Sequence, residues 1–257
     1  MAEIGRDGLV SVIVPVYNIE KFIVETMDCV RNQTYKEWEL LLVEDGSTDG
    51  TEAVITDYLE RVQDERIRLI KQPTNQGAAK ARNRGVEEAQ GRYVAYLDAD
   101  DLWVPEKLER ELAFLQEKQA AFVFTGYEFA DEEGKGTGKI VRVPGILTYK
   151  EALKNTTIFT TTVMFDTEKI KKELLIMPVI KSEDTALWWK ILRNGYVAYG
   201  LDENLAKYRR AGKTLSSNKL EAIRRIWNLY RKAEGMGVIS SAYHFCFWAV
   251  RAVLRRI

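Results

Sequence analysis

Short β-branched apolar runs alternate with helix-like segments through the first hundred residues of this chain. Because helices that connect neighbouring strands make those strands parallel, the alternation predicts an α/β fold with a mostly parallel sheet and helices on both faces. Ligands of such sheets bind beyond the carboxyl ends of the strands, so candidate functional residues are expected there. The predicted strands are 10–14, 38–43, 67–70 and 92–97, and the predicted helices between them are 20–31, 51–62 and 78–89.

The alternation weakens after residue 120. We predict strands over 121–129 and 160–165, a hairpin turn over 131–138, and helices over 182–193, 220–232 and 239–256. The glycine-rich turn lacks the spacing and the following helix of a phosphate-binding loop. With no internal repeat or low-complexity linker, we expect one domain over residues 1–212 and a helical tail over 213–257.

Composition excludes several classes of protein. Equal numbers of basic and acidic residues, 38 each, argue against a protein that coats nucleic acid. Two distant cysteines, Cys29 and Cys246, cannot form a disulfide framework, and a single histidine, His244, excludes a histidine-rich metal site. The chain begins without the pattern of a signal peptide, and no run approaches the ~18–20 apolar residues that cross a bilayer. We therefore expect a soluble, cytoplasmic protein.

The neutral total hides a basic C-terminal region. Residues 207–257 contain twelve basic and two acidic side chains. This gives the region a charge of +10 and leaves −10 on residues 1–206. The final predicted helix is apolar around most of its circumference, so it must be buried against the domain, a partner or lipid. Packing on the preceding helix through Ile223, Ile226, Trp227 and Tyr230 is one explanation. The basic charge, Trp248 and the terminal Arg255–Arg256 pair favour a peripheral membrane contact or a lipid-linked anion.

Carboxylates follow two of the predicted strands. Asp45 comes after the second strand, and Asp98, Asp100 and Asp101 follow the fourth. In extended backbone Asp98 and Asp100 would point the same way, and hard carboxylate oxygens suit Mg²⁺ or Mn²⁺. An acidic turn that caps the helix beginning at Pro105 is the structural alternative.

Two other enzyme classes fit these residues poorly. No G-x-G-x-x-G follows the first strand, which argues against a dinucleotide cofactor. A phosphatase with a phosphorylated aspartate would place its nucleophile on the first strand, and that strand has no acidic residue.

Five motifs follow one another along the chain: SVIVPVYN (11–18), VEDGSTDGT (43–51), NQGAAKARNRG (75–85), YLDADDLW (96–103) and EDTALW (183–188). Together they resemble the motifs of the family 2 glycosyltransferases. This resemblance implies the GT-A fold, with a nucleotide-sugar-binding half over 1–103 and an acceptor half over 104–212. Later segments, 208–210 and 215–219, are most similar to bacterial enzymes of surface-polysaccharide synthesis, such as teichuronic acid biosynthesis glycosyltransferases.

The resemblance implies roles for residues around the donor. Pro15, Tyr17 and Asp45 would line the nucleoside pocket, with Asp45 accepting a hydrogen bond from N3–H of uracil. Lys80 and Arg82 either reach the nucleotide or are charges on a helix face. Both readings stay open.

It also implies a metal site and a general base. Asp98 would contact the ribose or the metal, and Asp100 would hold the Mn²⁺ or Mg²⁺ that bridges the two phosphates. From the sequence alone, Ser182 is a helix N-cap and Glu183 and Asp184 are favoured by the helix dipole. In the family, the aspartate of this pair, here Asp184, deprotonates the acceptor hydroxyl.

We therefore expect an inverting, metal-dependent glycosyltransferase that moves a sugar from a nucleotide sugar, a UDP-sugar, to a saccharide or lipid-diphosphate-linked acceptor. A sugar nucleotidyltransferase is the alternative enzyme, but it would need a glycine- and arginine-rich loop after the first strand, where Tyr17–Glu20 lies. A catalytically inactive binding module would lack the acidic residues that are present here.

Overall fold

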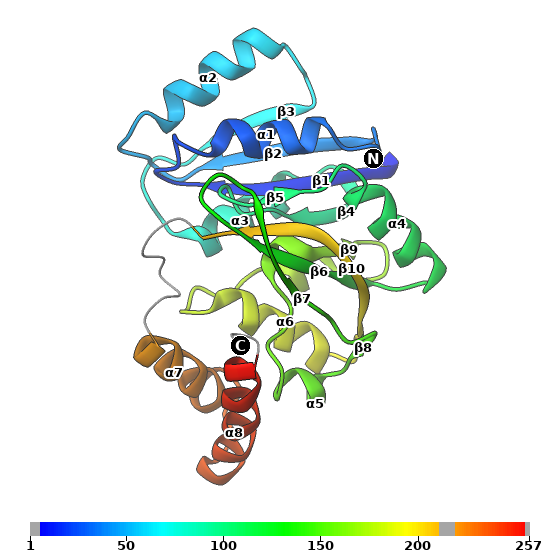
Figure 1. Ribbon diagram of the computed structural model, residues 1–257, viewed down its shortest axis with the longest axis vertical. Coiled ribbons are helices and arrows are strands. Elements are labelled where there is room, and N and C mark those ends of the chain that lie inside the picture. Colours follow the sequence, from blue (N-terminus) through cyan, green and yellow to red (C-terminus); the bar gives the residue numbers. More distant parts are fainter. Residues whose placement is uncertain (1–5, 211–218, 255–257) are drawn as a thin grey trace.

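A computed structural model describes residues 6–210 and 219–254. The core is one ten-stranded mixed sheet in the order β3-β2-β1-β4-β9-β6-β10-β5, with β7 paired to β6 and β8 to β10 (Figure 1). Helices cover both faces of this sheet, which confirms the predicted α/β architecture.

The N-terminal half is the parallel part of the sheet. β1 lies between β2 and β4 and is parallel to both, and β3 extends the sheet beyond β2. The predicted strands and helices of this half are confirmed, with ends that move by a few residues. Its elements are β1 (Arg6–Val16), α1 (Ile23–Arg31), β2 (Trp38–Glu44), α2 (Thr51–Val62), β3 (Ile67–Lys71), α3 (Ala78–Glu88) and β4 (Gly91–Tyr96).

The second half continues the same sheet with antiparallel strands. β9 is antiparallel to both of its neighbours, β4 and β6, and so joins the two halves. The predicted hairpin turn is confirmed, because β6 and β7 pair antiparallel around it. The elements are β5 (Leu102–Trp103), α4 (Lys107–Glu117), β6 (Phe122–Ala130), β7 (Gly136–Val141), β8 (Ile146–Leu147), α5 (Tyr149–Ala152), the 3₁₀ turn η1 (Thr160–Thr162), β9 (Val163–Asp166), the 3₁₀ turn η2 (Lys172–Leu175), α6 (Glu183–Arg193) and β10 (Ala198–Arg209).

The long strand β10 was not predicted from the sequence. Its pairing with β6 is parallel, but the register shifts between Leu201 and Asn204 and again between Asn204 and Ala206. Such bulges break the alternation of apolar and polar side chains that identifies a strand. The segment Asp202–Asn204 therefore reads as a polar loop, although it lies in the sheet.

Side chains of β1 alternate between two cores. Val10, Val12 and Val14 face the core that contains α1, α2 and α4, whereas Ile13 faces the core that contains α3 and α6. Helix α3 packs so closely on β1 that a Cβ on Gly85 would lie 2.3 Å from Ile13 Cγ2. A glycine is needed at this point because no side chain fits.

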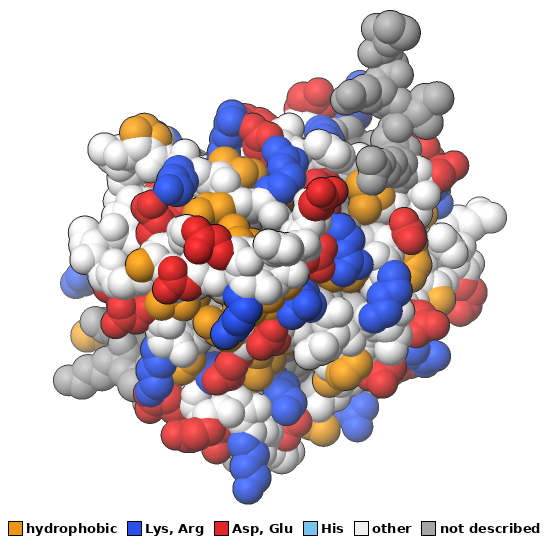
Figure 2. Space-filling model, turned by 90° about the horizontal axis from the view of Figure 1, so that it is seen from above, with side chains coloured by type: hydrophobic (Ala, Val, Ile, Leu, Met, Phe, Trp, Pro, Cys, Tyr) orange, Lys and Arg blue, Asp and Glu red, His pale blue; other side chains and the backbone are white. Residues whose placement is uncertain are grey.

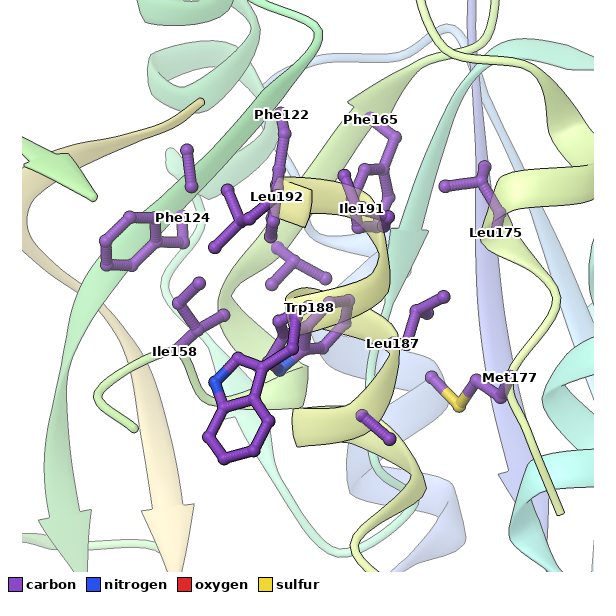
Figure 3. Close-up of a cluster of buried hydrophobic side chains, with 14 of the residues drawn as sticks. Phe122, Phe124, Ile158, Phe165, Leu175, Met177, Leu187, Trp188, Ile191 and Leu192 are labelled. Carbon is purple, nitrogen blue, oxygen red and sulfur yellow. The ribbon is translucent and has the colours of Figure 1, made fainter. Parts of the chain in front are cut away.

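Helix α6 packs into an aromatic group of the core through Trp188. Trp188 lies against Phe165 and Phe122 (Figure 3), with ring centroids 5.8 and 5.6 Å away. The Tyr96 ring lies 6.4 Å from it. Burial of one large aromatic side chain contributes roughly 3 kcal/mol or more to the free energy of unfolding, so α6 is held firmly against the sheet. The Glu183–Asp184 pair lies at the start of this helix.

The tail consists of α7 (Lys219–Asn228), a π-helical turn η4 (Leu229–Ala233) and α8 (Val238–Leu254). These elements lie beside α5 and α6, at the opposite end of the molecule from α2 (Figure 1). Within residues 6–210 and 219–254, no helix is both long and apolar enough to cross a membrane. The proposed boundary at 212/213 and the Arg255–Arg256 pair lie outside the described residues.

Candidate active site

The loops after β1 and β2 are joined by hydrogen bonds at the carboxyl end of the sheet. The Asn18 backbone N–H donates to Ser47 Oγ at 3.0 Å, and Asn18 Oδ1 accepts from the Thr48 N–H at 2.8 Å. Asn18 has φ of 49°, a left-handed conformation that asparagine tolerates better than most residues. These contacts fix the rim on which Tyr17 lies, with 46 % of its surface exposed.

Pro15 lies just inside this rim. The pairing of β1 with β4 ends at Ile13 and Tyr96, so the missing N–H of Pro15 removes no hydrogen bond from that side of the sheet. A proline is therefore tolerated in what is otherwise a central strand. Lys80 lies on the exposed side of α3, where its Nζ donates to Gln76 Oε1 at 3.3 Å.

Asp45 is buried and organises the loop that leads into α3. Its Oδ1 accepts hydrogen bonds from Gln72 Nε2 at 2.9 Å and from the Gln76 N–H at 2.8 Å. Its Oδ2 accepts one from the Gly77 N–H at 2.7 Å. A carboxylate has about four acceptor positions, so one on Oδ2 is left for a further donor. The contact with uracil stays a prediction, and N3–H of uracil could donate only to this remaining position on Asp45 Oδ2.

The three aspartates after β4 lie in a turn, not in extended backbone. The Asp101 N–H donates to the Asp98 carbonyl at 3.0 Å and closes this turn, so the expected strand-like alternation of Asp98 and Asp100 is wrong. Burial, and then the nearby charge of Asp98, raises the pKa of Asp100 to about 6. The two carboxylates are therefore close enough to repel each other.

Asp101 has a structural role within this turn. It is fully buried, and its oxygens accept from the Thr161 hydroxyl and from the Arg209 N–H, the latter at 3.0 Å. Burial, and then the charges of Asp100 and Asp98, raises the pKa of Asp101 well above its usual range. Of the three aspartates, only Asp98 and Asp100 are free to meet a ligand.

Arg209, at the end of β10, binds the same turn. Its Nε donates to the Asp100 carbonyl at 2.8 Å, and its Nη2 donates to Glu25 Oε2 at 2.6 Å. The guanidinium also lies over the Phe22 ring, 4.6 Å from the centroid. The turn is therefore fixed by α1 and β10 together.

Arg82 connects the two acidic motifs. Its Nη2 donates to Asp98 Oδ1 at 2.6 Å, and its Nη1 donates to Glu183 Oε1 at 3.3 Å. Arg82 is itself buried, and Asp98 and Glu183 each keep 24 % of their side-chain surface exposed. The carboxylates of the turn after β4 and of the first turn of α6, far apart in the sequence, thus belong to one site.

Asp184 is the neighbour of Glu183 on the first turn of α6. Its Oδ2 accepts from Thr160 Oγ1 at 3.4 Å and its Oδ1 from the Thr185 N–H at 2.6 Å. Burial, and then the charge of Asp184, raises the pKa of Glu183 above its usual value, while Arg82 opposes this shift. Ser182 occupies the N-cap position, but it has φ of 61° and makes no capping hydrogen bond through its side chain, so the predicted cap is wrong.

The residues at this site fit a divalent cation of the magnesium type. Mg²⁺ is commonly held by one or two carboxylates together with substrate phosphates, and Asp98 and Asp100 are two such carboxylates. The described part of the chain contains no cluster of three or more acidic, histidine or cysteine side chains that could enclose a metal alone. Burial, and then the charge of Asp98, disfavours the ionised form of Asp100, and a bound cation would favour that form.

Two features of this site were missed in the sequence. Local pattern leaves the role of Arg82 open and does not distinguish Arg209 within the segment 208–210. Neither could be read from local spacing, because Arg82 and Glu183 are 101 residues apart and Arg209 and Glu25 are 184 apart. A buried arginine needs carboxylate partners, and this would have been the only signal.

Figure 2 shows the face of the molecule that carries α2, where basic and acidic side chains are interspersed. No continuous basic surface is visible on this face, in keeping with the neutral total charge.

Solved structures of low sequence identity share this fold. The chain superimposes with a TM-score of 0.68 on residues 1–349 of TarS from S. aureus in complex with UDP-GlcNAc, at 22 % identity over 93 % of this chain and 71 % of that one. A mannosyltransferase from Pyrobaculum calidifontis, in complex with GDP-Man and Mn²⁺, gives a TM-score of 0.71 at 20 % identity, over 94 % of this chain and 73 % of that one. The GT-A fold expected from the sequence is thereby confirmed.

Relatives with higher identity are named glycosyltransferases. The teichuronic acid biosynthesis glycosyltransferase TuaG of Bacillus subtilis is 42 % identical over 97 % of this chain and 98 % of its own. A UDP-Glc:alpha-D-GlcNAc-diphosphoundecaprenol beta-1,3-glucosyltransferase of Escherichia coli, WfgD, is 35 % identical over 87 % of this chain and 85 % of its own. The model of glycosyl transferase family 2 matches residues 11–172. The chain belongs to this family of glycosyltransferases.

Proposed function

We propose that the protein transfers a sugar from a UDP-sugar to a hydroxyl group of a lipid-linked or polysaccharide acceptor, with inversion at the anomeric carbon. The observation that carries this proposal is the bridge made by Arg82, which brings Asp98 and Glu183 into one site. The names of the relatives support the donor and the acceptor, since WfgD is named for UDP-glucose and a diphosphoundecaprenol acceptor. Residues 1–103 would bind the donor, residues 104–212 the acceptor.

The proposed chemistry is a single displacement. Asp184 takes the proton of the acceptor hydroxyl, and the acceptor oxygen attacks the anomeric carbon from the face opposite the diphosphate. The bond from this carbon to the diphosphate breaks, and the nucleoside diphosphate leaves with the electron pair. A general base of this kind contributes typically 10²–10⁴-fold to the rate, and Thr160 holds Asp184 in place for it.

Donor binding would use residues at the rim of the sheet. Pro15 and Tyr17 would contact the nucleoside, Asp45 would accept from the base, and Lys80 is exposed where it can reach the phosphates. Mn²⁺ or Mg²⁺, when bound by Asp98 and Asp100, neutralises charge that develops on the departing diphosphate.

A donor screen tests this proposal. Purified protein is titrated with each UDP-sugar in the presence of Mn²⁺ or Mg²⁺, and thermal stabilisation and UDP release are measured. We expect stabilisation by UDP and by one class of UDP-sugar, and loss of it in Asp100→Asn. Stabilisation by GDP-sugars alone would contradict the proposed donor.

We further propose that the protein acts at the cytoplasmic face of the membrane, which it meets through α8. Ile239, Tyr243, Phe247 and Val250 recur along one side of α8 and are exposed, Ile239 by 89 %. Lys154 lies 5.0 Å from the centroids of both the Tyr243 and the Phe247 rings, which places a positive charge at this apolar face. Apolar side chains beside basic ones suit an anionic lipid surface.

The opposite side of α8 is packed against the protein. The Tyr230 and His244 rings stack with centroids 6.1 Å apart, and Trp248 Nε1 donates to Thr156 Oγ1 at 3.1 Å. The expectation that Trp248 faces lipid is therefore wrong, because it packs against the core cluster. The helix has one internal and one exposed apolar face.

Vesicle co-sedimentation tests the membrane contact. We expect binding to anionic vesicles that exceeds binding to neutral ones and that falls in Ile239→Ser/Phe247→Ser. Ile146→Ser, which changes an exposed isoleucine on β8, is the matched control. Equal, negligible binding of folded protein to both kinds of vesicle would contradict the proposal.

A further inference from the structure

A cavity lies between the tail and the loop that leads into the candidate general base. It has a volume of about 340 Å³. This is at the small end of the range of about 300–1,000 Å³ that is usual for ligand pockets. Its walls come from the loop before α6, from α7 and from η4, and the lining residues are Ile180, Lys181, Arg225, Asn228, Leu229, Lys232 and Ala233.

The cavity combines apolar walls with uncompensated positive charge. Ile180, Leu229 and Ala233 provide the apolar surface, while Lys181, Arg225 and Lys232 provide three cations. Lys181 pairs with Glu221 at 2.5 Å, which leaves a net charge of about +2 on the lining and this acid together.

Within the described ranges 6–210 and 219–254, Arg225 and Lys232 lack an ion-pair partner, although the charge of Arg225 contributes, after that of Lys181, to the lowered pKa of Glu221. Arg225 Nε is buried without a hydrogen bond. An unsatisfied buried guanidinium nitrogen is costly unless an anion meets it. Arg225, together with the exposed Lys232 beside an apolar wall, suits an anion that is attached to a hydrocarbon chain.

The position of the cavity relates it to the reaction. Lys181 lines the cavity and is three residues before Asp184, a separation that spans at most about 10 Å. The loop that lines the cavity therefore leads directly into the helical turn that carries Asp184. The exposed face of α8 belongs to the same tail, so lipid would lie on this side of the molecule.

We propose that this cavity is the site for the diphosphate of an isoprenoid-linked acceptor, with the first isoprene unit against Ile180 and Leu229. The inference rests on the proposed function, which supplies an acceptor of this class. It adds a second anion site, separate from the donor site at Asp98 and Asp100. The cavity is too small for a whole lipid, so the rest of the chain extends out of it.

Titration calorimetry with farnesyl diphosphate tests this inference on the full chain. The donor site is first saturated with UDP and Mn²⁺, so that the probe cannot occupy it. The pocket variant Arg225→Gln/Lys232→Gln is compared with Lys171→Gln/Arg224→Gln, which removes two exposed charges outside the cavity. Farnesol and inorganic diphosphate are titrated separately to isolate the chain and the anion.

We expect farnesyl diphosphate to bind the UDP-saturated protein, and to bind the pocket variant at least about tenfold more weakly, because two charge-assisted contacts are lost. The control variant should bind as the wild type does, and farnesol and diphosphate should each bind more weakly than the joined molecule. Equal binding by the pocket variant and the wild type, equal binding of farnesol, or loss of all binding when UDP is present would overturn the inference. UDP binding is measured in the same samples, and its absence would count against the proposed function and not against the cavity.

Discussion

Arg82 donates a 2.6 Å hydrogen bond to Asp98 from a side chain that is almost completely buried. The same guanidinium reaches Glu183 at 3.3 Å, so one cation is shared by carboxylates from β4 and α6. Burial alone would lower the pKa of Arg82, but the charges of Asp98 and Glu183 outweigh this effect and raise it. The guanidinium is therefore always protonated, and the charge balance of the site depends on it.

Replacement of Arg82 tests this balance. Arg82→Gln removes the charge that opposes the raised pKa of Glu183, so this pKa should rise further. Because Glu183 is the neighbour of the proposed base Asp184, its protonation would change the charge beside that base at a higher pH, and the acidic limb of the pH–rate profile should move to higher pH. Stability should fall by roughly 1–3 kcal/mol, less than for a fully buried pair because both carboxylates are partly exposed. Both are measured, by kcat/KM between pH 5 and 9 and by urea unfolding.

Arg84→Gln is the matched control for this experiment. Arg84 lies on the same helix, is exposed, and pairs only with Glu87 and Glu88. Its loss should change stability by less than about 1 kcal/mol and leave the pH profile in place. A profile that is unmoved in Arg82→Gln would show that Glu183 does not limit the reaction.

The two residues at the start of α6 have separable roles. Asp184→Asn should lower turnover by roughly 10²–10⁴ because the acceptor loses its base, while the affinity for UDP stays nearly unchanged. Glu183→Gln should lower turnover less, because Glu183 contacts Arg82 and acts on the reaction only as the neighbour of the base Asp184. Turnover and UDP affinity are measured for both. The reverse order of severity would place the base at Glu183.

Local pattern predicted the elements of this fold better than it predicted the site. Strand β2 is apolar at five of its seven positions and was predicted correctly, but β10 was missed because bulges place Asp202–Asn204 within a strand. Asp45, Asp98 and Asp100 could be predicted as site residues because each follows a strand, and a parallel sheet brings the carboxyl ends of its strands together. The partners of Asp45 and the αL conformation of Ser182 depend on tertiary contacts, which spacing does not contain.

Removal of the metal should act through Asp100 and Asp98. We expect turnover to be lost in the presence of a chelator and restored by Mn²⁺ or Mg²⁺, and Asp100→Asn to be inactive at any metal concentration. The measurement is UDP release with and without chelator. Undiminished turnover of the wild type in chelator would contradict the metal assignment.

Arg209 should act on activity through the shape of the aspartate turn. In Arg209→Met the Asp100 carbonyl and Glu25 lose their donors, so Asp100 is no longer held in place. We expect a weaker apparent affinity for Mn²⁺ with little change in UDP affinity measured without metal. Arg210→Met, which changes the next residue and leaves these contacts intact, is the control. Equal metal affinity in wild type and Arg209→Met would assign Arg209 to stability alone.

A buried ion pair on α4 leads to a prediction about the free energy of unfolding. Lys107 and Glu111 are both fully buried on α4 and hydrogen-bond to each other, and burial raises the pKa of Glu111 to about 7 and lowers that of Lys107. Breaking such a pair leaves one charge buried alone, so Glu111→Gln should cost about 3–5 kcal/mol, whereas Lys107→Met/Glu111→Leu should be neutral or stabilising. Urea unfolding of the three proteins measures this. If the double variant is as unstable as Glu111→Gln, the pair contributes more than the charge balance, for example through the contact of Lys107 Nζ with the Trp103 ring at 4.2 Å.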